Sequence, residues 1–235
     1  MVQINGVIEM GNKNKVGFPK KTLREEPNLI NSKQVKNLIS LFDIDEFFKI
    51  CKYKNLCGQI ENLQFRPFLS TVLNTVVDNK FTTVFHPRQC GFSTCISVLA
   101  LYYTQIMGES VQIISRKSHI YDKIVCSYIS LPDYVKFGVR EVNNDRIIFN
   151  NGTQINFKSK YPVSDIILVD YIYSKKELCN LNILTKVRKT NKLLVGNQYN
   201  NTDGKIFGSN HLEINDIEEF EKQYYRNEKL DYILK

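Results

Sequence analysis

Short apolar runs alternate with longer apolar or amphipathic segments through the middle of the chain. Residues 82–85 form a β-branched and aromatic run, which predicts a buried strand. Residues 87–91 contain Pro and Gly and therefore predict a loop. An apolar helix is expected next, from about residue 93 to residue 103.

The alternation of strands and helices continues on both sides of this unit. Asn151-Gly152, placed between short apolar runs, predicts a β-hairpin over residues 146–157. Residues 166–170 begin with four consecutive apolar side chains, as is typical of a strand covered on both faces. The pattern also predicts strands at residues 110–115 and 192–198, and helices at residues 33–42, 69–77, 118–129, 175–189 and 214–234.

Strands that alternate with helices predict an α/β fold with a mostly parallel sheet, to which the hairpin is attached. In such sheets ligands bind at the carboxyl ends of the strands. Three segments follow predicted strands, namely residues 88–94, 170–171 and 196–198. We expect these three segments to meet at one site.

The composition fits a single globular domain with a basic surface. The 235 residues suffice for one good core, and residues 1–34 are polar and predict a wrapping arm. We place the boundary between an N-terminal arm (1–44) and the main domain (45–235) before the first strongly apolar segment. The net charge of +8 is compatible with a polyanionic partner, although Lys scattered among Asn and Ile also produces it.

The same composition argues against several other classes of protein. No apolar run approaches the roughly 20 residues that span a bilayer, so we expect no membrane partner. The six cysteines include no C-x-x-C pair, and the three histidines lie far apart. This spacing argues against a zinc site or a disulfide framework and predicts reduced thiols.

The strand, Gly-containing loop and Ser/Thr-led helix near residue 90 have the layout of a phosphate-binding loop. Such a loop directs backbone N–H groups and a helix N-terminus at an anion. In the usual pattern a Lys precedes the Ser/Thr and reaches the β- and γ-phosphates. Here Phe92 occupies that place, and His86 occupies the place of the earlier Gly. On the loop alone, an ordinary strand–loop–helix unit is the simpler interpretation.

Several further segments occur in a particular order around this loop: residues 65–69, 87–94, 131–134, 151–155, 166–170 and 220–225. Their order and spacing resemble the N-terminal ATPase domain of the terminase large subunit of tailed phages, the motor that packages DNA into proheads. The resemblance covers roughly residues 45–230, and only the piece Arg-Gln-x-Gly-x-Ser-Thr is distinctive alone. It implies a P-loop NTPase fold of the RecA/helicase-like type, a mostly parallel sheet flanked by helices with a β-hairpin insertion.

The resemblance also implies a site for ATP and Mg²⁺. Ser93 and Asp170 would hold the metal ion. The implied nucleotide-binding residues are Arg66, Arg88, Gln89, Cys90, Gly91, Phe92, Ser93 and Thr94. Alternatively, Asp170 caps the turn after its strand, and Arg88 pairs with a local carboxylate.

Four departures from the family pattern fall in this implied site. Leu69 replaces the Gln that contacts adenine, Phe92 replaces the phosphate-binding Lys, Tyr171 replaces the acid after the metal-binding Asp, and residues 196–198 replace a Thr-rich motif. Single electrostatic contacts of this kind are often worth about 100- to 1000-fold in rate. The chain is therefore expected to hydrolyse ATP weakly or not at all, unless Arg88 supplies the missing charge.

These expectations leave three functions open. The first is a terminase-like ATPase-fold protein of a phage, linked to DNA packaging in the infected host cytoplasm and without the family's C-terminal nuclease domain. The second is a catalytically dead pseudo-ATPase that acts as a structural subunit of a virion, packaging or transcription complex. The third is a helicase-like nucleic-acid-binding domain. Expected partners are double-stranded DNA, further viral packaging or virion proteins, and other copies of the chain. The basic residues Lys186, Arg188, Lys189 and Lys192 would contact DNA phosphates or, as the simpler interpretation, form a solvated helix face.

Overall fold

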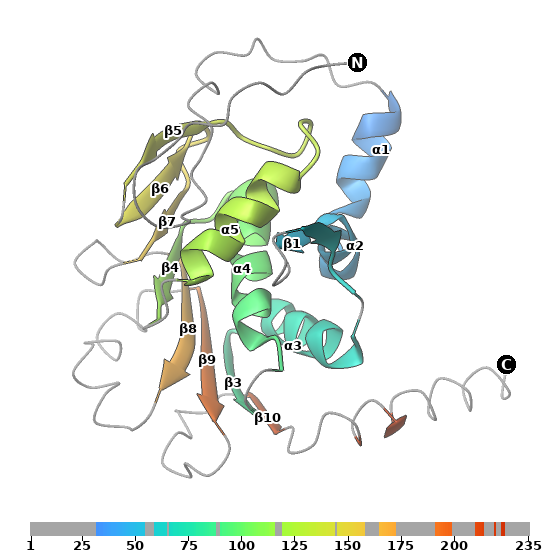
Figure 1. The fold of residues 1–235 in the computed structure, drawn as a ribbon, viewed down its shortest axis with the longest axis vertical. Coiled ribbons are helices and arrows are strands. Elements are labelled where there is room, and N and C mark those ends of the chain that lie inside the picture. Colours follow the sequence, from blue (N-terminus) through green and yellow to red (C-terminus); the bar gives the residue numbers. More distant parts are fainter. Residues whose placement is uncertain are drawn as a thin grey trace, which may run out of the picture.

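Eight strands of the computed structural model form one large sheet (Figure 1). The structure describes residues 32–54, 59–64, 66–87, 90–115, 119–143, 145–157, 165–172, 191–198 and 210–213, with 219, 222 and 223. The strands of the sheet are β3 (Phe81–His86), β4 (Val111–Ile114), β5 (Val139–Val142), β6 (Arg146–Phe149), β7 (Gln154–Asn156), β8 (Ile166–Ile172), β9 (Lys192–Gln198) and β10 (Asn210–Glu213). Their order across the sheet is β10-β3-β9-β8-β4-β7-β6-β5.

The sheet is mostly parallel, as predicted. The pairs from β10 to β7 are all parallel, and only β7–β6 and β6–β5 are antiparallel. Strand β9 lies between β3, which precedes the glycine loop, and β8, which carries Asp170. Strands β3 and β8 are therefore separated by one parallel strand, and their carboxyl ends lie at the same edge of the sheet.

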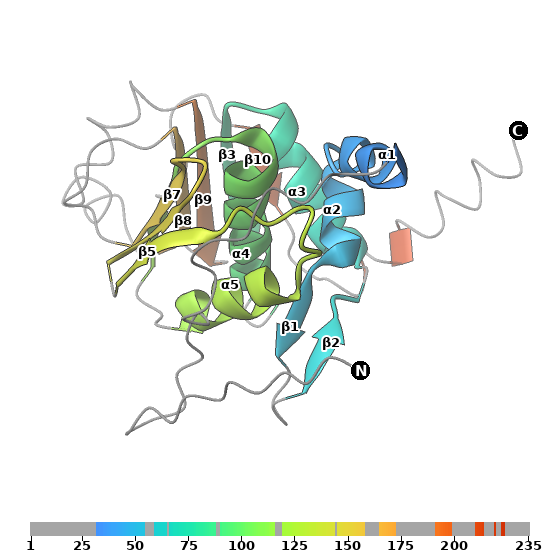
Figure 2. The same cartoon turned by 90° about the horizontal axis from the view of Figure 1, so that it is seen from above.

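The described helices lie on one side of this sheet (Figure 2). They are α1 (Ser32–Ser40), α2 (Ile44–Ile50), α3 (Pro67–Asp78), α4 (Phe92–Tyr102) and α5 (His119–Ser130). Helix α4 is apolar on nearly every face, and its buried residues include Ile96 and Leu99. A helix that is apolar all round belongs in the core, and α4 accordingly contacts α3, α5 and the sheet.

Strand β8 shows how the two faces of the sheet are filled. Ile166 and Leu168 lie in the large core beneath the helices, whereas Ile167 and Val169 lie in a second apolar cluster on the other face. All four side chains are fully buried. The predicted strand covered on both faces is confirmed, and its period of two places Asp170 on the same face as Ile166 and Leu168, towards α4.

The predicted hairpin at Asn151-Gly152 is also confirmed, and it is attached to an irregular turn of helix. Gly152 has a φ of +87°, which this tight turn requires. After α4 the chain continues as a π-helix (Tyr103–Met107), a form that leaves carbonyl groups out of the regular hydrogen-bond ladder. The carbonyl of Thr104 accepts hydrogen bonds from Asn151 Nδ2 at 3.0 Å and Thr153 Oγ1 at 3.2 Å.

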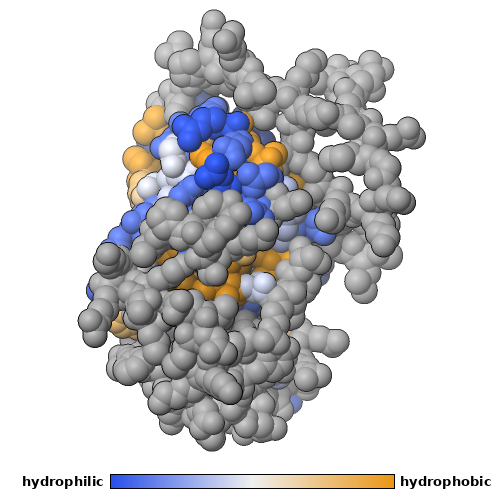
Figure 3. Space-filling view, turned by 90° about the vertical axis from the view of Figure 1, so that its left-hand side faces the viewer, coloured by the Kyte–Doolittle hydropathy of each residue, from blue (hydrophilic) through white to orange (hydrophobic). Residues whose placement is uncertain are grey.

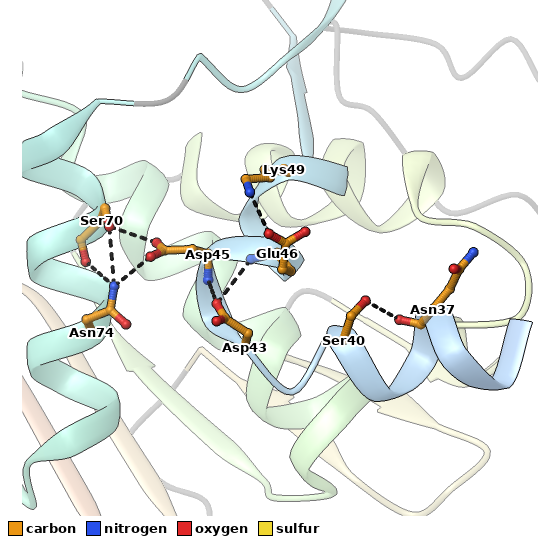
Figure 4. A network of polar contacts seen from close by, with 8 residues as sticks. All are labelled: Asn37, Ser40, Asp43, Asp45, Glu46, Lys49, Ser70 and Asn74. Carbon is orange, nitrogen blue, oxygen red and sulfur yellow. Dashed lines mark hydrogen bonds and ion pairs between the residues drawn. The ribbon is translucent and has the colours of Figure 1, made fainter. Parts of the chain in front are cut away.

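Helix α2 is held against α3 by one carboxylate (Figure 4). Asp43 caps α2, since its side chain accepts from the N–H groups of Asp45 and Glu46. Asp45 in turn accepts from Ser70 Oγ at 2.8 Å and Asn74 Nδ2 at 3.0 Å on α3. These bonds position α3, whose first turn contacts the glycine loop.

Several elements differ from the sequence-based expectations. Strands β5 and β10 were not predicted, nor was the small antiparallel pair β1 (Lys52–Lys54) and β2 (Ile60–Asn62), because these strands are short and polar. Helix α3 begins two residues earlier than predicted, because Pro67 suits the first helical position.

Two expectations about the ends of the chain stay predictions. The helix expected at 175–189 lies outside the described residues, as does nearly all of the helix expected at 214–234. The boundary between residues 44 and 45 falls at the start of α2, where Leu41 and Ile44 already belong to the core. The division into an arm and a domain stays a prediction.

The edge that β5 forms exposes polar and apolar side chains, since Arg140 and Val142 are both exposed. Figure 3 views the molecule from the side that lies on the left in Figure 1, and hydrophilic residues gather in its upper part. Glu141 on β5 and Arg146 on β6 form an ion pair there, with Arg146 Nη2 2.8 Å from Glu141 Oε1. Within the described ranges, no helix combines the length and the apolar character that crossing a bilayer would require.

Lys192, one of the basic residues considered for DNA contact, instead binds the C-terminal end of α3. Its ammonium donates to the carbonyls of Val76 at 3.2 Å and Asn79 at 3.3 Å, and to that of Val77. Burial lowers the pKa of Lys192, against the opposing effect of nearby carboxylates. The charge thus stabilises carbonyl groups that the end of a helix leaves without partners in the helix.

Replacing Lys192 by Met is expected to lower the free energy of unfolding by roughly 1–2 kcal/mol, because three carbonyl contacts are lost. Urea denaturation of Lys192→Met measures this loss. Lys36→Met, at an exposed position of α1, serves as the control and should change stability little. Equal stability of the two variants would contradict the capping role.

Candidate functional site

Four neighbouring strands carry residues near their carboxyl ends on the face that α4 covers. These residues, called the row below, are His86 on β3, Gly196 on β9, Asp170 on β8 and Ser115 just after β4. In the register of the sheet His86 lies two residues beyond the partner of Gly196, which is Val84. The residues two positions earlier, Val84, Leu194, Leu168 and Ile113, all lie in the core beneath the helices. Because side chains alternate along a strand, the four residues of the row face the N-terminal turn of α4.

The loop before α4 turns at Gly91. This residue has a φ of +91°, which favours glycine, and a Cβ at this position would lie 3.3 Å from Leu69 Cδ2. The carbonyl of Gly91 accepts from the N–H groups of Thr94 at 2.7 Å and Cys95 at 3.2 Å, which starts the helix. The N–H groups of Phe92 and Ser93 have no acceptor within the helix, so this turn is suited to an anion.

The predicted proximity of the glycine loop and Asp170 is confirmed. Ser93 Oγ donates to Asp170 Oδ1 at 2.9 Å, and Ser115 Oγ donates to Asp170 Oδ2 at 3.1 Å. The Asp170 side chain is almost fully buried, at 2 % exposure. Two hydroxyl donors therefore satisfy a carboxylate whose burial would otherwise be costly.

The same oxygens are chemically suited to Mg²⁺. This ion prefers hard oxygen ligands and binds through one or two protein groups together with water and phosphate oxygens. Ser93 and Asp170 supply such a pair, already within hydrogen-bond distance. Among the residues that the structure describes, no group of three His, Cys, Asp or Glu side chains could hold a metal alone.

The Phe92 side chain is packed in the hydrophobic core. Its side chain is 3 % exposed, and its ring stacks on His86 with 4.3 Å between centroids and 19° between planes. A Cβ on Gly196 would lie 2.2 Å from Phe92 Cε1 and 2.6 Å from the carbonyl oxygen of Asp170. The Phe92 ring therefore occupies the space that a side chain at position 196 would need. Position 92 offers no cation.

Cys90 and Cys95 border this packing. Cys90 Sγ lies 3.2 Å from His86 Nδ1, and both cysteines are buried. Burial raises the pKa of the Cys95 thiol, and the nearby charge of Lys123 lowers it by a smaller amount. The described cysteines pack as small apolar residues.

The remaining predicted site residues are only partly brought together. Arg88 and Gln89 lie outside the described residues. Arg66 is the residue before α3, where its carbonyl accepts from Leu69 N at 2.9 Å. Leu69 then packs against Gly91, in the place where the family pattern has the adenine-contacting Gln.

Two residues of the site were not predicted. Ser115 could have been found by alternation, since it follows Ile113 by two positions at the end of a strand. Lys123 on α5 donates its ammonium to Thr94 Oγ1 at 2.7 Å. No local pattern indicates this contact, because it depends on the packing of α5 against α4.

Comparison with known proteins identifies a solved structure with a similar fold. The crystal structure of the large terminase of bacteriophage HK97 matches with a TM-score of 0.51 and 12 % sequence identity. The match covers 69 % of this chain, which spans 37 % of the length of that terminase. No protein-family model and no curated protein sequence matches the chain.

The likeness to the HK97 terminase, together with the parallel sheet and the loop before α4, defines the class of fold. The predicted P-loop NTPase-like α/β fold is confirmed, with the hairpin β6–β7 at one side of the parallel strands. At 12 % identity the match describes the fold and leaves the activity to be argued from the site.

Gly196→Ala is expected to destabilise the protein by about 1–3 kcal/mol, because the added methyl group overlaps the Phe92 ring and a backbone carbonyl. Thermal and urea unfolding measure the loss. Combining it with Phe92→Leu should recover part of that loss, since only the overlap with the ring is relieved.

The single variant Phe92→Leu is the matched control for this pair. Full additivity of the two substitutions would show that the ring and Gly196 do not meet, and it would contradict the packing described above.

Proposed function

We propose that this chain is a terminase-like ATPase-fold protein of a phage, linked to DNA packaging, that binds Mg-nucleotide and hydrolyses it weakly or not at all. The observation that carries the proposal is the contact of Ser93 with Asp170 at 2.9 Å. It joins the start of the loop helix to the strand end where a P-loop fold holds its metal ion. The terminase-like fold supports the link to packaging.

Each part of the site has a role in this proposal. Ser93 and Asp170 hold Mg²⁺, which would neutralise charge on the phosphates when bound. The N–H groups at the start of α4 bind phosphate oxygens, and the helix dipole favours their charge. The basic net charge of +8 assists binding of nucleotide and of DNA.

Weak turnover is expected because two positions that carry a charged catalytic group in the terminase family carry an uncharged residue in this chain. Phe92 is packed on His86 and supplies no charge at the place of the phosphate-binding Lys. Tyr171 follows Asp170 where the family has an acid that orients or deprotonates the attacking water. Each missing contact is expected to reduce the rate by about 100- to 1000-fold.

The second candidate is a pseudo-ATPase that serves as a structural subunit of a viral complex. The buried Phe92 ring and the packing of Leu69 against Gly91 favour it, because both fill the loop region with apolar contacts. Such contacts stabilise the loop helix in the absence of a ligand.

Calorimetric titration with ATP, with and without Mg²⁺, separates these candidates. The wild-type chain is expected to bind Mg-ATP and its non-hydrolysable analogue with a Kd of roughly 1 mM or tighter. Asp170→Asn keeps an acceptor for Ser93 but removes the charge, so binding should lose its dependence on Mg²⁺. Asp133→Asn, at an exposed ion pair with Lys136, is the control and should bind as the wild type does.

A phosphate-release assay completes the test. A typical enzyme turns over about 10 times per second, so the loss of one contact predicts about 0.1 per second or slower. Absence of nucleotide binding would overturn the proposal in favour of the structural subunit. Turnover at the rate of a typical enzyme would show that the site is not impaired.

A further inference from the structure

Helix α1 presents an apolar face that the described part of the chain leaves uncovered. Val35, Ile39 and Phe42 are 43 %, 64 % and 55 % exposed, respectively. Residues three and four apart lie on the same face of a helix, so these three side chains form one stripe, called the α1 stripe below, along α1 and the turn after it. Leu38 is half-buried and Leu41 is buried, so these two face the body of the protein. The α1 stripe is therefore apolar surface beyond what the packing of α1 uses.

The charges beside the α1 stripe are positive. The charged residues of α1 are Lys33 and Lys36, both exposed, and the helix contains no acidic residue. Asp43, the next acidic residue along the chain, is engaged as the cap of α2. An exposed apolar stripe bordered by lysines suits a partner surface that combines apolar and acidic side chains.

Residues 213–224, called the acidic segment below, have this combination. The first nine of them include five acidic residues and no basic residue, whereas residues 1–31 carry five basic and three acidic residues. Ile217, Phe220 and Tyr224 recur at the spacing of one helical face. Glu219 and Gln223 are helical and exposed, and Glu219 Oε1 accepts from Gln223 Nε2 at 3.2 Å. On a helix these two residues lie opposite the three apolar positions, so the acidic segment has an apolar face bordered by carboxylates.

The acidic segment begins on the far side of two helices from α1. It starts at the end of β10, which pairs with β3, and β3 contacts α3, which in turn contacts α2. Helices α2 and α3 lie between β10 and α1 in both ribbon views (Figure 1 and Figure 2). A helix over residues 214–224 would be about 16 Å long, whereas two packed helices are about 20 Å across. The acidic segment therefore suits the α1 stripe of a second copy rather than that of its own chain.

We propose that copies of this chain associate head to tail, with the acidic segment of one copy on the α1 stripe of the next. Apolar side chains of the two helices pack against one another, and the lysines of α1 pair with carboxylates along the border. The contact joins two different surfaces, so its repetition produces rings or open chains rather than closed pairs. The α1 stripe is small, so the contact belongs to the weak, transient class and is sensitive to salt. It does not depend on nucleotide binding.

Analytical ultracentrifugation of the full chain at rising concentrations tests this contact. The wild type should associate in a concentration-dependent manner, and added salt should weaken the association. Ile39→Glu and Phe220→Glu each place a charge in the apolar contact from one side, so each should weaken association about 10- to 100-fold. Ile60→Glu replaces an isoleucine on β2 that is also exposed, so this matched control should associate as the wild type does. Circular dichroism of each variant checks that it is folded.

Charge reversal identifies the segment that occupies the α1 stripe. Replacing Lys33 and Lys36 by Glu, or Glu218 and Glu221 by Lys, should weaken association about 10-fold, because each change creates like charges across the contact. A chain that carries both reversals has opposite charges again and should recover most of the affinity. If the substitutions in the acidic segment leave association unchanged, another partner covers α1 and the inference is wrong. A wild type that stays monomeric at every concentration would overturn it as well.

Discussion

The hydrogen bond between Ser93 and Asp170 joins the two halves of the candidate site, and it depends on one constraint of the sheet. Asp170 faces α4 because side chains alternate along β8, whose apolar residues fill both faces of the sheet. Ser93 reaches it because β3, β9 and β8 are parallel neighbours, so the loop after β3 opens at the carboxyl end of β8. A shift of β8 by one residue would turn Asp170 away and bring Val169 to the site.

The second organising contact is the stack of Phe92 on His86, over Gly196. His86, Phe92 and Gly196 form one close-packed contact at the start of α4. Packing of this kind keeps the start of α4 in place in the absence of phosphate. Packing thus holds the loop before α4, and the buried ring at position 92 offers no charged group to a ligand.

Much of the fold was predictable from the sequence, because it rests on local patterns. The apolar run of β8, the strand–loop–helix unit around Gly91 and the hairpin at Gly152 all have signals within a few residues. The short strands β1, β5 and β10 were missed because they have only three or four residues with little apolar alternation. Strands β1 and β5 pair with the next strand along the chain, whereas β10 pairs with β3, which is distant in sequence. Propensity carries little information about such strands.

The candidate site was predictable only in part, for a related reason. The proximity of Ser93 to Asp170 follows from strand order, so the topology alone predicts it. The burial of Phe92 and the contact of Lys123 with Thr94 depend on side-chain packing between elements, which one sequence does not reveal. Arg88 keeps its predicted role as an expectation, because it lies outside the described residues.

A double-mutant cycle on Ser93→Ala and Asp170→Ala tests the central contact most directly. The account predicts a coupling of about 1 kcal/mol or more in the free energy of unfolding, because a hydroxyl bonds a buried carboxylate. The pair Ser70→Ala and Asp170→Ala provides the reference, since Ser70 bonds Asp45 instead, and it should be additive. A coupling between positions 93 and 170 within about 0.3 kcal/mol of zero would contradict the account.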